Sequence, residues 1–348
     1  MMKMIPFHYP PITSYPVIAN NLGILWSYKK EVLPWFADHF IQLVAEDTPN
    51  ILNNNEYDLI SFYEGVNPDN NMAFNDCPFF YESRVDRIVF DSHINSFSDF
   101  IITSIDNGYC FETIIDNYYL PCSTKYKKDH YYHSTLIYGY DSSSDTVYLA
   151  DFLENGKYVT NHCNFDEINR GYASVPIMSD IIPSWMKLTF MKKYVEANYK
   201  VNVQLLYRFL SDYILSRDSF DKYKYSFSHG NRKLYFGIDS YMALVKHCLS
   251  NKDLDIISFH VMYDHKVAMK LRCQYLHKEG LLTESFFEDN LVSIDLLISN
   301  ILKIRNMAIK FTITENKKIM SRIIELLYEY QLSDLAIHKK IIDNLLLN

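Results

Sequence analysis

The chain has 348 residues and a formal net charge of −8. That length is sufficient for one large domain or two ordinary ones, each with a hydrophobic core. A hydrophobic fraction of 48% and a charged fraction of 22% are typical of a soluble globular protein. The acidic balance disfavours nucleic-acid binding, because no basic field is available to neutralise phosphates. The chain contains no GxGxxG or GxxxxGK[ST] segment, which disfavours nucleotide binding by a glycine-rich loop.

Cysteine spacing and apolar runs also exclude several classes of protein. The six cysteines form no CxxC pair, which disfavours a zinc ribbon or a thioredoxin-like redox site. The N-terminal sequence has early prolines and no apolar run of signal-peptide length. No apolar stretch reaches the roughly 18 residues of a membrane span. We therefore expect a cytoplasmic protein with reduced thiols that has neither a membrane nor a nucleic acid as a partner.

The first half of the chain has the pattern of short strands mixed with a few helices. Residues 8–16 are rich in proline and should be extended. Helices are then predicted over residues 17–28 and 33–45, where apolar residues recur at helical spacing. The elements predicted next are a loop at the asparagine run 53–55, strands over 58–62, 79–82 and 87–90, a helix over 97–106 ended by Gly108, and strands over 110–119, 133–140 and 146–151.

The second half, after about Pro183, has helical periodicity almost throughout. Helices are predicted over residues 196–215, 232–250, 255–277, 284–305, 315–327 and 334–347. We therefore expect an α+β domain over residues 1–182 and a helical domain over residues 183–348. Helices followed by strands indicate an α+β order rather than the βαβ alternation of a doubly wound sheet.

The candidate catalytic residues are His133 and Asp151, in the segment HYYHSTLIYGYDSSSDTVYLAD. The segment has the pattern of two strands joined by a polar turn, with His133 on the first strand and Asp151 at the end of the second. Adjacent antiparallel strands bring such side chains together. A catalytic imidazole takes a proton from the attacking group, and an acceptor on its other nitrogen fixes its tautomer. The same spacing also fits a structural role, with His133 as a partly buried strand residue and Asp151 capping a loop.

Other histidines permit alternative interpretations. A metal site at His130 and His133, with His162 as a third ligand, requires His130 to lie in the loop before the strand, because residues three apart on a strand point to opposite faces. His260 and His265 lie five apart on a predicted helix, which is poor geometry for a shared ligand. We expect His265 and its neighbours to form an interdomain polar cluster or a solvated face.

Several segments together carry a resemblance to a known family. These are DNYYLP, KKDHYYHSTLIYGYD and YLAD in the first half, with LYFGIDSYMALVKHCL and FHVMYDHKVAMKLRCQYL in the second. They are similar to the butirosin biosynthesis protein H N-terminal-like family, which has a papain-like cysteine-peptidase fold related to bacteriocin-leader peptidases. The segments of the second half are similar to the helical extension of members that are encoded with nonribosomal peptide and polyketide gene clusters. The resemblance therefore covers most of the chain.

The resemblance implies acyl transfer in natural-product biosynthesis. The acyl group would come from the thioester of an acyl or peptidyl carrier protein and pass to a small-molecule amine, forming an amide. His133 would act as base and then acid, and Asp151 would orient it. The resemblance implies no cofactor in the protein itself, because the substrate would be presented on the phosphopantetheine arm of the carrier.

The nucleophile of the family is missing. The family pattern has a cysteine at the start of the first helix, where the helix dipole favours a thiolate. Leu22 and Tyr28 fit the positions that follow it, and this alignment places Val17 where the cysteine is expected. Nearby polar residues offer poor replacements: Ser14 precedes Pro16 in an extended segment, Asn20 and Asn21 are weak nucleophiles, and Ser27 lies well inside the helix.

Cys77, in the loop-like sequence NDCPFF, is the remaining candidate thiol, although a buried structural role is commoner for such a cysteine. Without a thiol, His133 could still act as general base while the amine attacks the thioester directly. The alternative hypothesis is a catalytically degenerate binding or scaffold protein of the same fold. A peptidase is the least favoured, since peptide bonds require the nucleophile far more than thioesters do.

Overall fold

The computed structural model describes residues 1–46, 59–63, 74, 77–176, 187–194, 197–220, 233–250 and 254–346. It divides the chain into two compact units. Unit 1 comprises Met1–Val32 and Cys77–Asn198, and unit 2 comprises Leu33–Asp76 and Tyr199–Asn348. The units are therefore interleaved in sequence and do not meet at the single boundary expected between residues 182 and 183. The expected loop at 53–55 and the composition change at Pro183 lie outside the described residues.

Unit 1 contains an antiparallel sheet of seven strands within the described residues, in the order β4-β9-β5-β6-β7-β8, with β1 paired to β6. The strands are β1 (Met2–Met4), β4 (Phe80–Asp86), β5 (Cys110–Asp116), β6 (Tyr132–Asp141), β7 (Thr146–Glu154), β8 (Lys157–Cys163) and β9 (Lys187–Lys193). Strand β9 lies between β4 and β5, which is why residues beyond 182 belong to unit 1.

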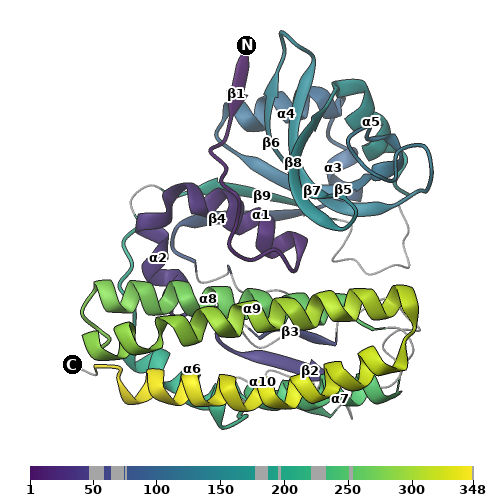
Figure 1. Ribbon diagram of the computed structural model, residues 1–348. Helices are drawn as coiled ribbons and strands as arrows, with labels where there is room; N and C mark the ends of the chain where they lie inside the picture. Colours follow the sequence, from purple (N-terminus) through teal and green to yellow (C-terminus); the bar gives the residue numbers. More distant parts are fainter. Residues whose placement is uncertain are drawn as a thin grey trace. The chain divides into compact units, whose positions relative to one another are not determined.

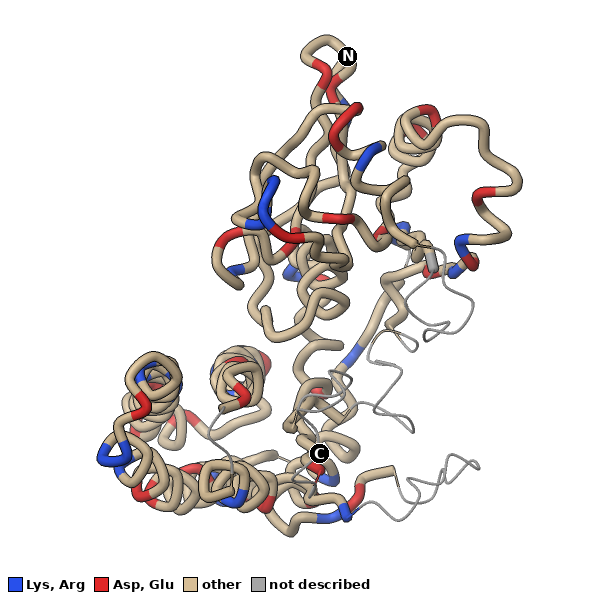
Figure 2. Tube along the Cα trace, turned by 90° about the vertical axis from the view of Figure 1, so that its right-hand side faces the viewer, with Lys and Arg blue, Asp and Glu red and all other residues tan. Residues whose placement is uncertain are grey.

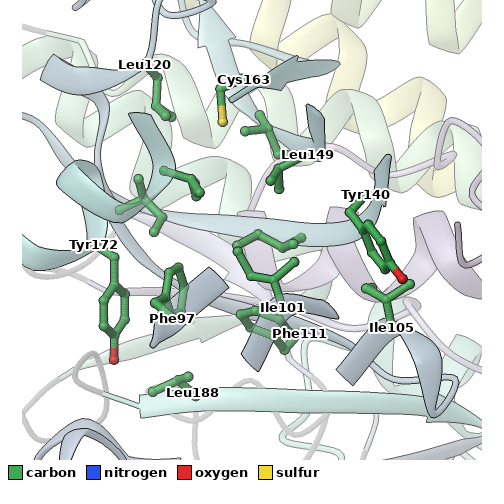
Figure 3. Packing of buried hydrophobic residues seen from close by; sticks show 14 of the residues in the cluster. Phe97, Ile101, Ile105, Phe111, Leu120, Tyr140, Leu149, Cys163, Tyr172 and Leu188 are labelled. Atoms are coloured by element: carbon green, nitrogen blue, oxygen red, sulfur yellow. The ribbon is translucent and has the colours of Figure 1, made fainter. Parts of the chain in front are cut away.

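Helices cover both faces of this sheet (Figure 1). They are α1 (Pro16–Leu25), α3 (Arg87–Asp91), α4 (Phe97–Asp106) and α5 (Phe165–Ala173), with 3-10 turns η1 (Trp26–Tyr28) and η3 (Asn117–Tyr119). Ala19 and Ile24 of α1 pack with sheet residues on one face. Helices α3, α4 and α5 cover the other face, where Phe97, Ile101 and Tyr172 join strand residues in a larger core cluster (Figure 3). Burial of these side chains is the main stabilising contribution in unit 1.

Local sequence signals account for the helix predicted over residues 97–106, which is confirmed. The hydroxyl oxygen of Ser96 accepts a hydrogen bond from the Asp99 amide at 3.2 Å, which caps the first turn. Gly108, with φ of +81°, follows the last turn in the left-handed conformation that glycine adopts without strain.

The glycine of the GYD sequence permits a close approach between strands. Strand β1 pairs with the second half of β6, with Met4 opposite Gly139. A Cβ atom on Gly139 would lie 2.7 Å from Cγ of Met4 and 3.0 Å from the carbonyl oxygen of Lys3. Only glycine therefore fits at this position without moving β1.

Unit 2 consists mainly of helices together with a small sheet. The sheet has the order β10-β2-β3, with strands β2 (Leu43–Glu46), β3 (Ile60–Phe62) and β10 (Leu234–Phe236). The helices are α6 (Val203–Ile214), α7 (Ser240–Ser250), α8 (Ile256–Lys278), α9 (Glu284–Thr314) and α10 (Lys317–Asp343), with the 3-10 turn η5 (Gly237–Asp239). The long helix α9 contacts both α8 and α10 (Figure 1). Helix α2 (Lys29–Ala37) carries the chain from unit 1 into unit 2.

The α+β class of the first part and the helical character of the last part are thus confirmed. Among the described residues, no helix combines the length and apolar character needed to cross a membrane. Lys and Arg are interspersed with Asp and Glu along the described trace of each unit (Figure 2). Examples of ion pairs are Arg84–Glu82 within β4 and Lys270–Asp295 between α8 and α9, each at 2.6 Å.

The helix predicted over residues 33–45 is wrong in its second half. Helix α2 ends at Ala37, and β2 begins at Leu43. The buried guanidinium of Arg272 donates to the carbonyl oxygens of Ala37, His39 and Phe40 at 2.6 to 3.2 Å. These contacts stabilise the end of the helix, because terminal carbonyls that lack helical partners need other donors.

Further element predictions are also wrong. The helix predicted over residues 232–250 begins only with α7 at Ser240, and Leu234–Phe236 form strand β10. The strand predicted over residues 87–90 is helix α3, where Arg87 pairs with Asp91 one turn later and donates to the carbonyl oxygen of Tyr172. The helices predicted over 315–327 and 334–347 are parts of one helix, α10. Asp334 does not begin a helix but sits inside one and binds residues of other helices. The sequence pattern predicts no element over β1, β8, β9 or α5.

Asp334 lies at the centre of a buried polar cluster in unit 2. Its Oδ2 atom accepts hydrogen bonds from Lys266 Nζ at 2.6 Å, Tyr213 OH at 2.7 Å and Tyr241 OH at 2.9 Å. All four side chains are at most 1% exposed. Burial lowers the pKa of Lys266 to about 8. Although burial opposes it, the charge of Lys266 holds the pKa of Asp334 well below its ordinary value, so both groups are charged at neutral pH.

His265 belongs to the same cluster. Its Nδ1 atom lies 2.8 Å from Lys266 Nζ, and its Nε2 atom lies 2.7 Å from the carbonyl oxygen of Ile41. Burial and the neighbouring Lys266 hold the pKa of His265 well below its ordinary value, so the ring is neutral. The expectation of an interdomain cluster or a solvated face is therefore wrong for His265 and Lys266, which are fully buried among residues of unit 2.

We predict that Lys266→Met destabilises the protein by roughly 3–5 kcal/mol, because it leaves the Asp334 carboxylate buried without its cation. The measurement is the free energy of unfolding in urea. Lys270→Met is the matched control on the same helix: its partner, Asp295, also lies at 2.6 Å, but the two side chains are 31% and 49% exposed. That substitution should cost less than about 1 kcal/mol. Equal effects of the two substitutions would contradict the proposed importance of the buried pair.

Candidate active site

Strands β6 and β7 place His133 and Asp151 on neighbouring strands. Leu136 pairs with Ala150, so Thr135 and Asp151 are the next opposed positions toward the start of β6. His133 lies two residues further along the same strand. Opposed and diagonal side chains on adjacent antiparallel strands are within reach of each other. The register therefore positions both Thr135 and His133 to bind the Asp151 carboxylate.

The Asp151 carboxylate is fully buried, and both of its oxygens are hydrogen-bonded. Oδ1 lies 2.5 Å from His133 Nδ1 and accepts a hydrogen bond from the Phe152 amide at 2.6 Å. Oδ2 accepts from the Thr135 hydroxyl at 2.7 Å. A buried carboxylate is stable only when such donors replace its lost water.

The Asp151 carboxylate fixes the orientation of the His133 ring and favours its protonated form. Burial alone would lower the pKa of His133, but the charge and hydrogen bond of Asp151, aided by Glu112, outweigh it and raise the pKa above 6.5. With Nδ1 bound to Asp151, Nε2 carries the acceptor lone pair of the neutral ring. Nε2 has no hydrogen-bond partner among the described residues, and the side chain is 18% exposed. This arrangement suits a general base.

Aromatic rings surround the imidazole. The Tyr131 ring stacks on His133 with a centroid distance of 5.2 Å and an interplanar angle of 15°. Phe152 contacts the imidazole edge-on at 5.7 Å, and Tyr158 packs against Phe152 at 5.4 Å. The rings cover much of the imidazole and so strengthen its interaction with Asp151.

A second buried polar cluster links α1 to the sheet. Asn20, in the second turn of α1, donates from Nδ2 to Glu112 Oε2 at 2.7 Å. Its Oδ1 accepts from the Tyr158 hydroxyl, also at 2.7 Å. Burial raises the pKa of Glu112 to about 7, with a further contribution from Asp151. Since Asn20 is fully buried and both its amide nitrogen and its amide oxygen bind other residues, it is not available to polarise a substrate carbonyl.

His130 also pairs with a buried aspartate, but it is a different one. His130 Nδ1 lies 2.6 Å from Asp116 Oδ2, and the His130 side chain is 54% exposed. Asp116 also accepts from the amides of Tyr118 and Tyr131 and from the hydroxyl of Ser174, at 3.0 to 3.1 Å. The Asp116 carboxylate therefore closes the loop before β6, and His130 supplies only one of its four contacts.

A metal interpretation receives no support from this geometry. His130 does lie in the loop before β6, as that interpretation required, but His130 and His133 each bind their own carboxylate. His162 is exposed on β8. Within the described ranges, no group of three or more His, Cys, Asp or Glu side chains is suited to hold a metal ion.

The expected nucleophile position is occupied by an aliphatic side chain. Helix α1 begins at Pro16 after the N-cap residue Tyr15, so Val17 lies in the first turn. Leu22 is buried in the same helix, and Tyr28 ends the following 3-10 turn. Ser27 lies in that turn, with its hydroxyl 3.1 Å from His8 Nδ1. The first predicted helix thus begins within one residue of its expected start, and no thiol lies there.

The cysteines of unit 1 are poor replacements. Cys77 is buried. Burial raises the pKa values of Cys110 and Cys122 to about 12 and that of Cys163 well above its ordinary value. Thiols with such pKa values are not nucleophiles at neutral pH, because the thiolate is the reactive form.

The structure therefore brings together the predicted pair, His133 and Asp151, and adds Thr135, which binds the same carboxylate. Glu112 belongs to the separate cluster around Asn20. Thr135 could have been predicted from the alternation along β6, because it lies on the same strand two residues after His133. Glu112 has no such signal: its contact with Asn20 joins residues 92 positions apart in the sequence.

No family model matches the chain, and no curated protein matches it detectably in sequence.

We predict that Asp151→Asn lowers the pKa of His133, because the substitution removes the negative charge that favours the imidazolium. Loss of an adjacent carboxylate is expected to lower a pKa by roughly 1–3 units. Titration of the imidazole resonances by NMR measures this directly. The matched control is Asp116→Asn, which removes the carboxylate bound to His130 and should leave the titration of His133 in place. An unchanged His133 titration in Asp151→Asn would refute the assignment of Asp151 as its partner.

Proposed function

We propose that the protein is an acyltransferase of natural-product biosynthesis, an amide synthase in which a His133–Asp151 dyad serves as the acid–base centre. The acyl donor is the thioester of an acyl or peptidyl carrier protein, and the acceptor is a small-molecule amine. The observation that carries this proposal is the 2.5 Å contact between His133 Nδ1 and a fully buried Asp151 carboxylate, with Nε2 unpartnered among the described residues.

The proposal includes a papain-like fold for unit 1. Support comes from the order of its elements, in which helix α1 precedes six of the seven described strands of an antiparallel sheet. The histidine and the acid lie on the adjacent strands β6 and β7. This is the arrangement that the resemblance of the sequence to papain-like biosynthetic enzymes implies. The helical unit 2 corresponds to the extension found in some members of that family.

The chemistry follows from the dyad without a covalent intermediate. The amine nitrogen attacks the thioester carbonyl, and His133 Nε2 takes the proton that the nitrogen loses as the C–N bond forms. The C–S bond then breaks, and the imidazolium returns the proton to the departing thiolate. The products are an amide and the free thiol of the carrier arm, so protons and electrons balance. A thioester is already activated, which makes positioning and proton transfer sufficient for useful acceleration.

Asp151 contributes by holding the imidazole and stabilising its charged form. A carboxylate on Nδ1 fixes the tautomer that presents an acceptor at Nε2. The hydrogen bonds from Thr135 and the Phe152 amide hold the carboxylate itself in place. The proposal involves no cofactor within the protein, because the carrier's phosphopantetheine arm presents the acyl group.

A binding or scaffold protein of the same fold is the second candidate. Val17 at the start of α1 favours it, because an aliphatic residue replaces the nucleophile there. Such a protein would bind an acylated carrier or a pathway intermediate without turning it over. The buried His133–Asp151 pair would then stabilise the ends of β6 and β7.

Replacing His133 separates these functions. We predict that His133→Gln lowers amide formation by about 10²- to 10⁴-fold, the usual contribution of a general base. Turnover is measured by mass spectrometry of the product, using a panel of acyl-loaded carriers and amines. His130→Gln is the control, since His130 has the same type of pairing, is 54% exposed, and leaves Asp116 with three other donors.

Three outcomes are informative. Loss of product only in His133→Gln supports the dyad. An acyl adduct on the protein in the same mass spectra would instead identify a replacement nucleophile. Carrier binding with neither product nor adduct in the wild-type protein would favour the scaffold.

The dyad also predicts a pH dependence. The base is the neutral imidazole, and Asp151 raises the pKa of His133 above 6.5. The value of kcat/KM should therefore rise with pH and reach half its maximum above pH 6.5, after correction for ionisation of the amine. A profile that is already flat at pH 6 would exclude His133 as the base.

A further inference from the structure

A short segment before strand β6, residues 124–129, carries a local positive charge, and we call it the basic loop. It holds Lys125, Lys127 and Lys128 against one acid, Asp129, in a chain whose formal net charge is −8. Lys125 pairs with Asp129 at 3.2 Å, with the two side chains 43% and 65% exposed. Lys127 and Lys128 are exposed and form no ion pair with any described residue. The basic loop therefore presents two uncompensated cations to solvent.

Backbone hydrogen bonds hold the basic loop in place. The Thr124 amide donates to the carbonyl oxygen of Leu153 on β7 at 2.9 Å, and the Lys127 amide donates to that of Tyr118 at 3.0 Å. Lys127 has a φ of +52°, a left-handed conformation that glycine or asparagine adopts at lower cost. Lysine is thus not the residue that this turn favours, and its charge is the property that requires an explanation.

Contacts join the basic loop to the candidate active site. Lys125 Nζ lies 5.8 Å from the centroid of the Tyr131 ring, and that ring stacks on His133 at 5.2 Å. Leu153, which accepts the hydrogen bond that anchors the loop, lies two residues after Asp151 on β7. The His133 side chain is 18% exposed. The basic loop therefore lies beside the place where the imidazole reaches solvent.

We propose that the basic loop is the docking surface for the phosphodiester of the carrier protein's phosphopantetheine arm. This inference rests on the function proposed above. The phosphodiester is the charged group of the arm, and it lies at the opposite end from the thioester. Lysine binds a phosphate as a point charge, and the tyrosine rings beside the loop offer an apolar surface to the uncharged part of the arm. A phosphate held at the basic loop directs the thioester toward His133.

The separation between the basic loop and the imidazole suits this arrangement. Lys128 lies five residues before His133, so their Cα atoms are at most about 18 Å apart, the reach of five extended residues. An extended phosphopantetheine arm, built of amide-linked segments, spans a distance of this order. The net negative charge of the chain disfavours anions elsewhere, so a local basic surface also orients the approach of an anionic donor.

The test compares 4′-phosphopantetheine with pantetheine as probes, because the two differ only in the phosphate. NMR titration of the backbone amides measures both dissociation constants and identifies the amides that shift. We expect phosphopantetheine to bind the wild-type chain roughly 3- to 10-fold more tightly at low salt, with shifts at residues 124–129. High salt should reduce this preference, since exposed charges are screened.

The double variant Lys127→Asn/Lys128→Gln should lose the preference for phosphopantetheine. Asparagine is used at the first position because it tolerates the left-handed backbone. The matched control is Lys317→Asn/Lys318→Gln, which removes the same charge from two adjacent exposed lysines at the start of α10 and should keep the preference. With acyl-loaded carriers, the basic-loop variant should raise KM roughly 3- to 10-fold and leave kcat unchanged, whereas His133→Gln lowers kcat.

The outcomes separate this inference from the proposed function. Equal binding of the two probes to the wild-type chain, or a preference that persists in the folded basic-loop variant, would overturn the docking surface even in an active enzyme. A preference that is lost in the variant of a protein without turnover would support the docking surface and contradict the acyltransferase. Equal kcat/KM for acyl-coenzyme A and acyl-carrier donors would overturn the carrier as the occupant.

Discussion

Burying the carboxylate of Asp151 costs several kcal/mol unless hydrogen bonds replace its water, and β6 and β7 supply those bonds only in one register. A slip by one residue would remove the Thr135 hydroxyl and the His133 imidazole from the carboxylate and turn their side chains to the other face. The need to satisfy Asp151 therefore fixes the pairing of the two strands as well as the orientation of the imidazole. In unit 1, the same contacts serve stability and the proposed chemistry, and substitutions at this point affect both.

The fold could be predicted best where local chemistry decides the backbone. The helix over residues 97–106 was predictable because a serine cap and a following glycine mark its ends. Prediction failed where distant residues decide. Helix α2 ends where Arg272, more than 230 positions away, binds its last carbonyls. Residues 87–90 form a helix in which Arg87 binds the end of α5. Apolar periodicity in a short segment does not contain such information.

The candidate site likewise contains residues whose contacts could be predicted from the sequence and residues whose contacts could not. His133 and Asp151 were predictable because one turn joins their strands, so sequence order implies adjacency. Asn20 was considered only as a residue that might polarise a carbonyl, and its actual partners, Glu112 and Tyr158, lie 92 and 138 positions away. The strand order β5-β6-β7-β8 and the packing of α1 on one face of the sheet bring them together, and no periodic pattern in the sequence reveals that order.

The interleaving of the two units has a consequence for how this architecture can be inherited or dissected. Strand β2 of unit 2 lies in the sequence between the two segments that form unit 1. Strand β9, which belongs to the sheet of unit 1, lies beyond residue 182. A single crossover between genes therefore cannot exchange either unit whole. A fragment ending at residue 182 would lack the strand between β4 and β5 and would expose the backbone edges of both. The two units are thus expected to be kept, lost and expressed together.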